Sequence, residues 1–254
     1  DLYILDRLED GRYQVPLTGK IYSLEETFIK PYVRGKDVHR FETLGAVKYI
    51  FFPYIVENDV ARPVTLEELK SSCPLTYQYV MDNEAEFKAR EGKKAAQKEI
   101  WYVYLREQNL NKYEKPRISS MEICSNYPNL AWNPGIYHGT KVYSWLINPE
   151  MENQISNYFL LAIGNSKLMW WFLKLTGDTL SSDSRTMKTN YLSPFPLPLE
   201  PNPNIKESIE RLVKERLSCQ DAMSSISIEQ QINDKVCELY GITDEEKEVI
   251  DAAY

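Results

Sequence analysis

The chain has 254 residues, of which 43% are hydrophobic and 26% charged, a composition that suits a globular protein with a sizeable core. No uninterrupted run of 18 apolar residues occurs, so the sequence predicts no membrane-spanning helix and no membrane partner. No C-x-x-C pair occurs either, and we expect isolated thiols in a reducing cytoplasm at the four cysteines, Cys73, Cys124, Cys219 and Cys237.

The formal net charge of −7 belongs to the C-terminal part of the chain. Residues 200–254 contain 13 acidic and 6 basic residues, whereas residues 1–199 contain 24 of each sign. The larger part of the chain is therefore neutral overall and can carry a basic face that binds an anionic partner.

The first 60 residues predict short strands separated by glycine turns, at residues 12–17, 20–24 and 47–56. A helix is expected after Thr65, whose hydroxyl can cap it, and a second helix over residues 76–91. Residues 101–147 return to aromatic and β-branched clusters broken by prolines, which is typical of further strands and turns.

The second half of the chain predicts mainly helices. Residues 154–175 are apolar on most sides, which indicates a central buried helix. A polar loop that leads into a strand and a proline-rich stretch precede the C-terminal helices, which we expect at residues 205–218, at 226–240 and after Thr243. We therefore predict an α+β fold, with a β-rich domain over residues 1–200 and a small helical segment over residues 201–254.

Signals of catalysis are weak. The sequence has two histidines and no metal-binding spacing, P-loop, G-x-S-x-G or G-x-G-x-x-G motif, so we expect no catalytic or metal-binding residue. The stretch NPGIY at residues 133–137 lacks the second proline and the aromatic position of an adenine-N6 methyltransferase loop. Three Glu-x-Lys triplets on predicted helices are better explained as ordinary helix surface, at Glu68–Lys70, Glu91–Lys93 and Glu245–Lys247.

Basic residues gather in four clusters of the β-rich part, interleaved with aromatic residues. The clusters are Lys30, Arg34, Lys36 and Arg40; Lys112, Lys115 and Arg117; Tyr137, His138 and Lys141; and Arg185 with Lys188. Duplex DNA carries about one charge per 1.7 Å of its axis, so such loops on a single face would bind it without any catalytic group. Taken one at a time, each cluster is better explained as scattered solvated charge, and only the clusters together favour DNA binding.

Several stretches together resemble one protein family. They are IKPYVRGKDVHRF, YIFFPY, PLTYQYVMDNEAEFKARE, WYVYLREQN, KPRISSMEI, NYFLLAIGNSKLMWWFL, YLSPFPLPLEPNP and KVCELYGITDEEKEVID, in this order. In that order they resemble the C-terminal specificity domain of Taq-type adenine-N6 DNA methyltransferases, which is shared with combined type II restriction–modification enzymes. The resemblance implies a β-rich fold like that of the recognition domains of type I specificity subunits.

The resemblance also implies a division of labour within a longer protein. An N-terminal methyltransferase domain of the same chain would bind S-adenosylmethionine, with a nuclease as a possible addition. The present chain would need no cofactor, and it would hold double-stranded DNA so that one adenine can be methylated.

The resemblance and the basic clusters together give a set of expected DNA contacts. We expect them at Lys30, Arg34, Lys36, Arg40, Lys115, Arg117, Tyr137, His138, Lys141, Arg185 and Lys188. Bases would be read from residues 112–145 and 178–190, whereas Arg34 and Lys36 would contact phosphate or support the fold. The acidic segment after residue 205 would face away from DNA. Two alternatives stay open, a protein–protein interaction module of a phage-defence complex with tyrosine-rich loops, and a nuclease that uses a Glu-x-Lys triplet.

Overall fold

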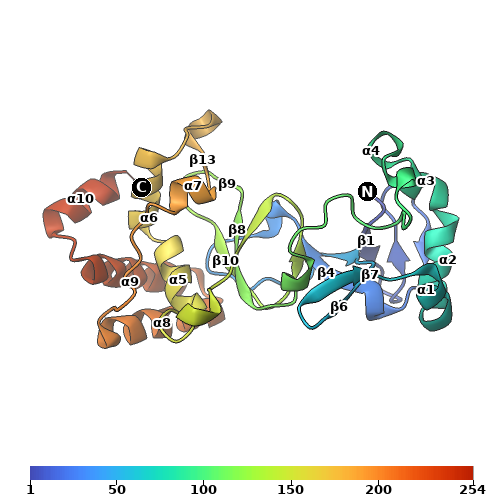
Figure 1. Ribbon diagram of the computed structural model, residues 1–254. Helices are drawn as coiled ribbons and strands as arrows, with labels where there is room; N and C mark the ends of the chain where they lie inside the picture. Colours follow the sequence, from blue (N-terminus) through green and yellow to red (C-terminus); the bar gives the residue numbers. More distant parts are fainter. Residues whose placement is uncertain (254) are drawn as a thin grey trace. The chain divides into compact units, whose positions relative to one another are not determined.

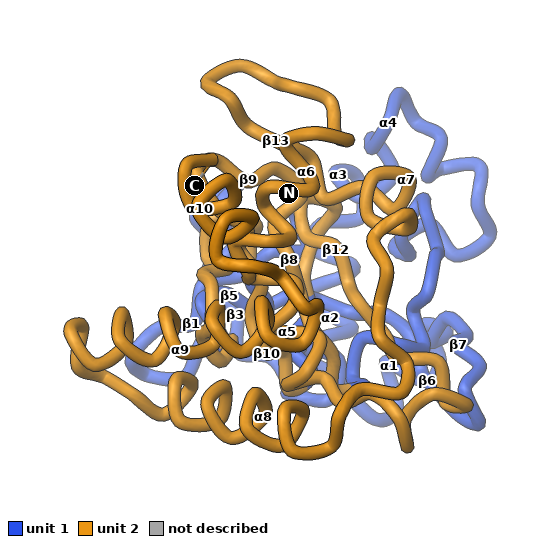
Figure 2. The backbone as a smooth tube through the Cα atoms, turned by 90° about the vertical axis from the view of Figure 1, so that its left-hand side faces the viewer, with its two compact units in different colours: residues 1–33, 45–115, 135–137 blue, residues 34–44, 116–134, 138–254 orange. Residues whose placement is uncertain are grey.

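The computed structural model describes residues 1–253, which form two compact units (Figures 1 and 2). Unit 1 comprises residues 1–33, 45–115 and 135–137, and unit 2 comprises residues 34–44, 116–134 and 138–254. The chain combines helices with several sheets, so the predicted α+β class is confirmed. Compact units reflect contacts and not function, and the functional division at residue 200 stays a prediction.

Unit 1 is built on a sheet with the strand order β11–β4–β5–β1–β2–β3. Its strands are β1 (Ile4–Arg7), β2 (Tyr13–Gln14), β3 (Ile21–Tyr22), β4 (Ile29–Val33), β5 (Lys48–Phe51) and β11 (Tyr137–His138), of which Tyr137 belongs to this unit. A separate hairpin is formed by β6 (Tyr54–Glu57) and β7 (Val60–Pro63). Its turn residues Asn58 and Asp59 have φ values of 52° and 61°, as a tight hairpin between right-handed twisted strands requires.

Short helices follow the hairpin in unit 1. They are α1 (Leu66–Ser72), α2 (Pro74–Asp82), α3 (Glu84–Lys88) and α4 (Arg90–Lys93). The expected cap of α1 is confirmed, because the Thr65 hydroxyl accepts a hydrogen bond from the Glu68 amide and the Glu68 carboxylate accepts one from the Thr65 amide. The single helix predicted over residues 76–91 is wrong. Asn83 leaves the helical conformation and its side chain donates to the Tyr79 carbonyl, which divides the segment.

The core of unit 1 is largely aromatic. Phe51 lies 5.6 Å from Tyr79 and 6.2 Å from Tyr3 between ring centroids, and Phe87 packs against all three rings. The hydroxyl of Tyr3 donates to the carbonyls of residues 102 and 103, so its polar end is satisfied inside the core. Within residues 1–253, Tyr127 is the single exposed tyrosine. Most of the tyrosine content is therefore used for packing.

Unit 2 contains two small antiparallel sheets. The strands are β8 (Arg117–Met121), β10 (Leu130–Asn133) and β12 (Val142–Trp145) in the order β10–β8–β12, and the pair β9 (Ile123–Cys124) with β13 (Arg185–Thr186). In the central strand, Ser119 lies opposite Ala131 on one side and Ser144 on the other. Residues 117–120 of β8 are all buried, so both faces of the central strand are covered.

The helices of unit 2 correct one prediction and confirm others. They are α5 (Asn157–Gly164), α6 (Lys167–Thr176), α7 (Thr189–Leu192), α8 (Pro203–Ser218), α9 (Ala222–Tyr240) and α10 (Asp244–Ala252). The single helix expected over residues 154–175 is divided, because the Asn165 side chain exchanges two hydrogen bonds with the Leu130 backbone and Ser166 caps α6. The three C-terminal helices are confirmed, with Gly241 in the left-handed region after α9 and Thr243 as the cap of α10.

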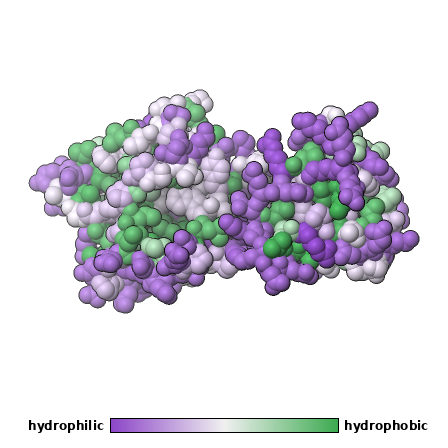
Figure 3. Space-filling model, in the orientation of Figure 1, coloured by the Kyte–Doolittle hydropathy of each residue, from purple (hydrophilic) through white to green (hydrophobic). Residues whose placement is uncertain are grey.

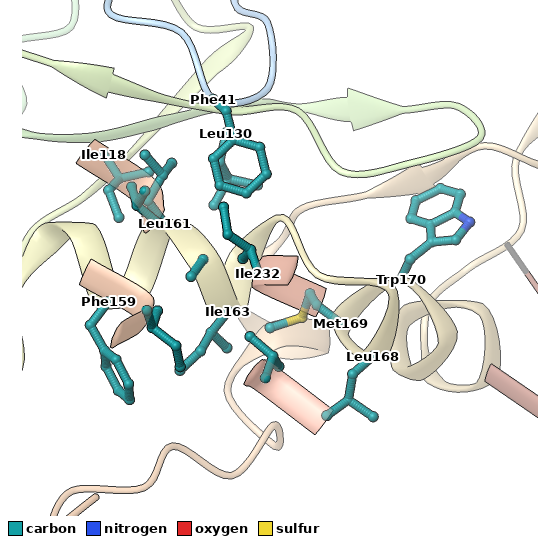
Figure 4. Close-up of a cluster of buried hydrophobic side chains, with 14 of the residues drawn as sticks. Phe41, Ile118, Leu130, Phe159, Leu161, Ile163, Leu168, Met169, Trp170 and Ile232 are labelled. Atoms are coloured by element: carbon teal, nitrogen blue, oxygen red, sulfur yellow. The ribbon is translucent and has the colours of Figure 1, made fainter. Parts of the chain in front are cut away.

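Helix α5 joins the sheet of unit 2 to its helices. It packs against β8 and β10 and also against α8 and α9. Figure 4 shows Phe41, Ile118 and Leu130 from the loop and strands beside Leu161 of α5 and Ile232 of α9. Hydrophilic side chains cover the visible surface over α8 (Figure 3), and no helix within residues 1–253 is long and apolar enough to cross a membrane.

Candidate nucleic-acid interface

The turn at residues 34–37 presents two basic side chains in unit 2. The Asp37 carboxylate accepts a hydrogen bond of 2.8 Å from the Arg34 amide and thereby closes the turn Gly35–Asp37. Since this carboxylate serves the backbone, it does not pair with the neighbouring cations. Arg34 and Lys36 are exposed, and neither makes an ion pair within residues 1–253.

This turn lies against the loop that carries Lys141. A Cβ added at Gly35 would lie 3.0 Å from the Lys141 carbonyl oxygen and 3.3 Å from its Cβ, so a side chain here would push the two segments apart. The structure therefore brings the turn of the first predicted cluster, at residues 34–37, next to Lys141 of the third cluster.

Glu122 connects Lys141 with the fourth cluster. Its Oε2 lies 2.7 Å from the Lys141 Nζ, and the Glu122 amide donates to the Lys141 carbonyl at 3.0 Å. Its own carbonyl accepts from the amide of Met187, the residue before Lys188. The Lys141 hydrogen bond is the main reason that the pKa of the Glu122 carboxyl is lowered, and the charge of Lys188 lowers it further.

These contacts define one basic region, which we call the basic surface of unit 2. It consists of the exposed side chains of Arg34, Lys36, Lys141 and Lys188. The acidic residue within it, Glu122, has a side chain that is only 21% exposed, compared with 74% for Lys141. The cations are therefore more accessible to a large anion than the carboxylate is.

Arg117 and His138 lie buried beneath strand β12. The Arg117 Nε donates to the Ser144 Oγ at 2.9 Å, and the Ser144 Oγ lies 2.7 Å from the His138 Nε2. Burial lowers the pKa of His138 to about 4, so the imidazole is neutral at pH 7. If its Nδ1 donates to the Gly139 carbonyl, the Nε2 accepts from Ser144 and every hydrogen bond has a donor. Both residues were expected to read bases, but neither side chain is exposed in this structure. Their hydrogen bonds to Ser144 instead support strand β12.

Arg185 is also buried, although its loop was expected to read bases. Its Nη1 donates to the carbonyl and carboxylate oxygens of Asp183, at 3.0 and 2.9 Å, and its side chain is 6% exposed. The adjacent strand pairing places Arg185 opposite Cys124. In this conformation the guanidinium organises its own loop, and Lys188 is the exposed cation of the cluster.

Arg40 contacts the C-terminal helices of unit 2. Its Nε lies 3.1 Å from Glu229 on α9, its Nη2 donates to the Asn165 carbonyl, and its side chain is 14% exposed. Glu229 also accepts from Arg216 at 2.7 Å. Arg40 was expected to contact DNA, but these interactions hold the loop of residues 34–44 to the helices.

The remaining predicted residues lie in unit 1 and have acidic partners. Lys30 is 3.0 Å from Glu114, and the Tyr137 hydroxyl donates to the same carboxylate. The Lys30 hydrogen bond is the main cause of the lowered pKa of Glu114. Lys115 lies 2.8 Å from Asp59. Sequence reasoning found these cations but missed their carboxylates, which are up to 84 residues away along the chain.

The Glu-x-Lys triplets are separate features of the fold. Glu68 is bound by Arg62 and the Thr65 amide, and these hydrogen bonds lower its pKa to about 2. Glu91 and Lys93 lie in a left-handed turn, with φ values of 44° and 71°. No group of three or more His, Cys, Asp or Glu residues within residues 1–253 is placed to hold a metal ion.

Comparison with known proteins finds a likeness among solved structures. No protein-family model and no curated protein matches the sequence. Among solved structures, the chain is similar to a type IIL restriction-modification enzyme, MmeI, which was solved in complex with DNA. The match has a TM-score of 0.57 at 11% identity, and covers 86% of this chain and 29% of that chain. The likeness shows a fold related to part of a restriction-modification enzyme and does not support the narrower Taq-type assignment.

Proposed function

We propose that this chain is a DNA-recognition module of a restriction-modification enzyme, and that the basic surface of unit 2 contacts the duplex. One observation carries the proposal: parts of three predicted clusters, distant in sequence, are linked through Gly35, Lys141 and Glu122 into one region with four exposed cations. The likeness to part of a DNA-bound restriction-modification enzyme supports it.

The charge distribution of unit 2 agrees with binding of the duplex through the basic surface. Exposed cations that neutralise phosphates would release counterions, so binding should weaken as salt rises. Helices α9 and α10 of the same unit carry 8 acidic and 2 basic residues and would be repelled by phosphates. Docking through α9 and α10 is therefore disfavoured relative to docking through the basic surface.

We further propose that the module serves adenine-N6 methylation. The catalytic step and S-adenosylmethionine would belong to a methyltransferase domain of the same polypeptide, outside this sequence. The matched enzyme is more than three times as long as the part that resembles this chain, which leaves room for such a domain there. The present chain would hold the duplex in register while one adenine leaves the stack, a step that costs a few kcal/mol.

A salt titration with two matched double variants tests the proposal. Binding of a fluorescent duplex would be measured by anisotropy at several KCl concentrations. Arg34→Ala/Lys36→Ala should reduce the slope of log K against log salt by about 2, or roughly 1 for each lost phosphate contact. The control is Arg211→Ala/Lys214→Ala, which removes one Arg and one Lys from α8 and should leave the slope unchanged.

Equal effects of the two double variants would overturn the assignment of the surface. Binding of the wild type that does not change with salt would overturn DNA recognition itself and would favour a protein partner. The structure weakens that alternative in one respect, because Tyr127 is the single exposed tyrosine within residues 1–253. The other described tyrosines, which a docking module would have to expose, are buried or partly buried.

A further inference from the structure

Glu122 is a carboxylate within the basic surface of unit 2, where it pairs with Lys141. An acidic residue at this place repels phosphate and forms an ion pair with one of the four cations, so it lowers the affinity for any duplex. A site built only for tight DNA binding would lack it. The geometry of Glu122 indicates what it contributes instead.

The position of Glu122 is fixed from several sides. It lies between β8 and β9, and its amide and carbonyl bond to the backbones of Lys141 and Met187. Its Oε2 is 2.7 Å from the Lys141 Nζ, and its Oε1 accepts from the Tyr143 hydroxyl at 3.3 Å. The carboxylate is thus anchored on the strands, while the flexible Lys141 side chain, 74% exposed, depends on it for a defined position.

We propose that Glu122 is a specificity-determining residue that keeps Lys141 from binding phosphates indiscriminately. This inference rests on the proposed function. Lysine is a flexible point charge that can reach any nearby phosphate. While Lys141 is paired with Glu122, its side chain keeps one direction and part of its charge is neutralised. Contacts with base edges then contribute a larger share of the binding free energy than contacts with the DNA phosphates.

The inference predicts that Glu122→Gln strengthens binding to random-sequence DNA. The amide keeps the shape of the side chain but loses the charge, and Lys141 becomes free to neutralise a phosphate. The affinity for random-sequence duplex should rise roughly three- to tenfold at moderate salt, and the salt slope should become steeper by about 1. The ratio between the affinities for preferred and random duplexes should fall. A residue that only supports the fold would weaken both affinities.

The experiment uses the 254-residue chain and a library of random duplexes. Selection with the wild type defines the preferred sequence, and anisotropy then gives the affinities of each variant for preferred and random duplexes. Glu122→Gln in a Lys141→Ala background should have no further effect, since its target is absent. Asp59→Asn is the matched control, because Asp59 pairs with the exposed Lys115 at 2.8 Å in unit 1.

The outcomes separate this inference from the proposed function. It is supported if Glu122→Gln strengthens random-duplex binding and lowers discrimination, while Asp59→Asn does neither. It is overturned if discrimination is unchanged, if the effect persists in the Lys141→Ala background, or if Asp59→Asn behaves in the same way. If the wild type binds DNA with a steep salt dependence but selects no sequence, the inference fails, whereas the proposed contact between the basic surface and the duplex stands. Loss of all salt-dependent binding overturns both.

Discussion

The group formed by Arg40, Glu229 and Arg216 is the clearest place to test how unit 2 is held together. One carboxylate serves two guanidiniums, at 3.1 and 2.7 Å, and the three side chains are 14%, 19% and 15% exposed. Removing one partner of a fully buried ion pair costs about 3–5 kcal/mol, because a charge stays behind without compensation. In Glu229→Gln the amide oxygen still accepts one hydrogen bond and water screens part of the charge. We therefore expect a loss of about 2–3 kcal/mol.

For a chain of this size, each kcal/mol lowers the melting temperature by roughly 2–4 °C, so Glu229→Gln should melt about 4–12 °C lower. Tryptophan fluorescence is a suitable probe, since Trp132, Trp145, Trp170 and Trp171 all lie in unit 2. The control is Glu238→Gln on the same helix. Glu238 is exposed and pairs with the partly exposed Lys235, so the change should cost less than about 1 kcal/mol. Equal melting of Glu229→Gln and the wild type would refute the reasoning.

Three further substitutions test whether residues of unit 2 stabilise the fold, and the first of them also tests DNA contact. Arg40→Ala should lower the melting temperature without changing the salt slope of DNA binding, and a reduced slope would return Arg40 to the interface. His138 is held neutral with a pKa of about 4, so its contribution to stability is present above the unfolded pKa of about 6.5 and is lost as the pH falls towards 4; the wild type should lose about 2 kcal/mol more than His138→Gln between pH 7.5 and 5 in urea titrations. Gly164→Ala should destabilise by about 1–2 kcal/mol in the same titrations, because its Cβ would overlap the buried Leu130 side chain, whereas Gly45→Ala meets nothing within 4 Å and should be nearly neutral.

Local signals predicted several boundaries of the fold. Thr65 and Thr243 each begin a helix because their hydroxyls, together with a glutamate three residues later, satisfy backbone amides that have no partner within the helix. Gly241 ends α9 because the left-handed conformation costs glycine least. Each of these causes operates within four residues, so the sequence alone contains it.

The division between α5 and α6 could not be predicted in the same way. The apolar pattern continues across residues 154–175, but the Asn165 side chain bonds to the backbone of Leu130, which is 35 residues away. A tertiary hydrogen bond that satisfies buried backbone groups outweighs helix propensity, which amounts to a few tenths of a kcal/mol for each residue. The signal was an asparagine followed by a serine inside an apolar run.

The candidate site shows the same limit. Arg117 and Lys188 appear equivalent in the sequence, yet one is buried in the central strand β8 and the other is exposed after β13. Composition indicates where cations are, whereas exposure depends on strands that pair across long stretches of chain. Glu122 was missed for a related reason, because its importance comes from contacts with the loop of Lys141 and with Met187.

The number of accessible cations also limits what this chain does by itself. Four phosphate contacts give a salt slope of about −3.6, whereas a protein that binds an operator tightly has a slope near −10. One of the four, Lys141, is partly neutralised by Glu122. If the proposed function holds, the chain alone should bind duplex DNA weakly, and tight binding would need a second protein surface on the opposite face of the duplex. Weak binding would then have a physical advantage, because a module that binds phosphates tightly would be retained at random sequences, whereas one that depends on a partner domain could release them.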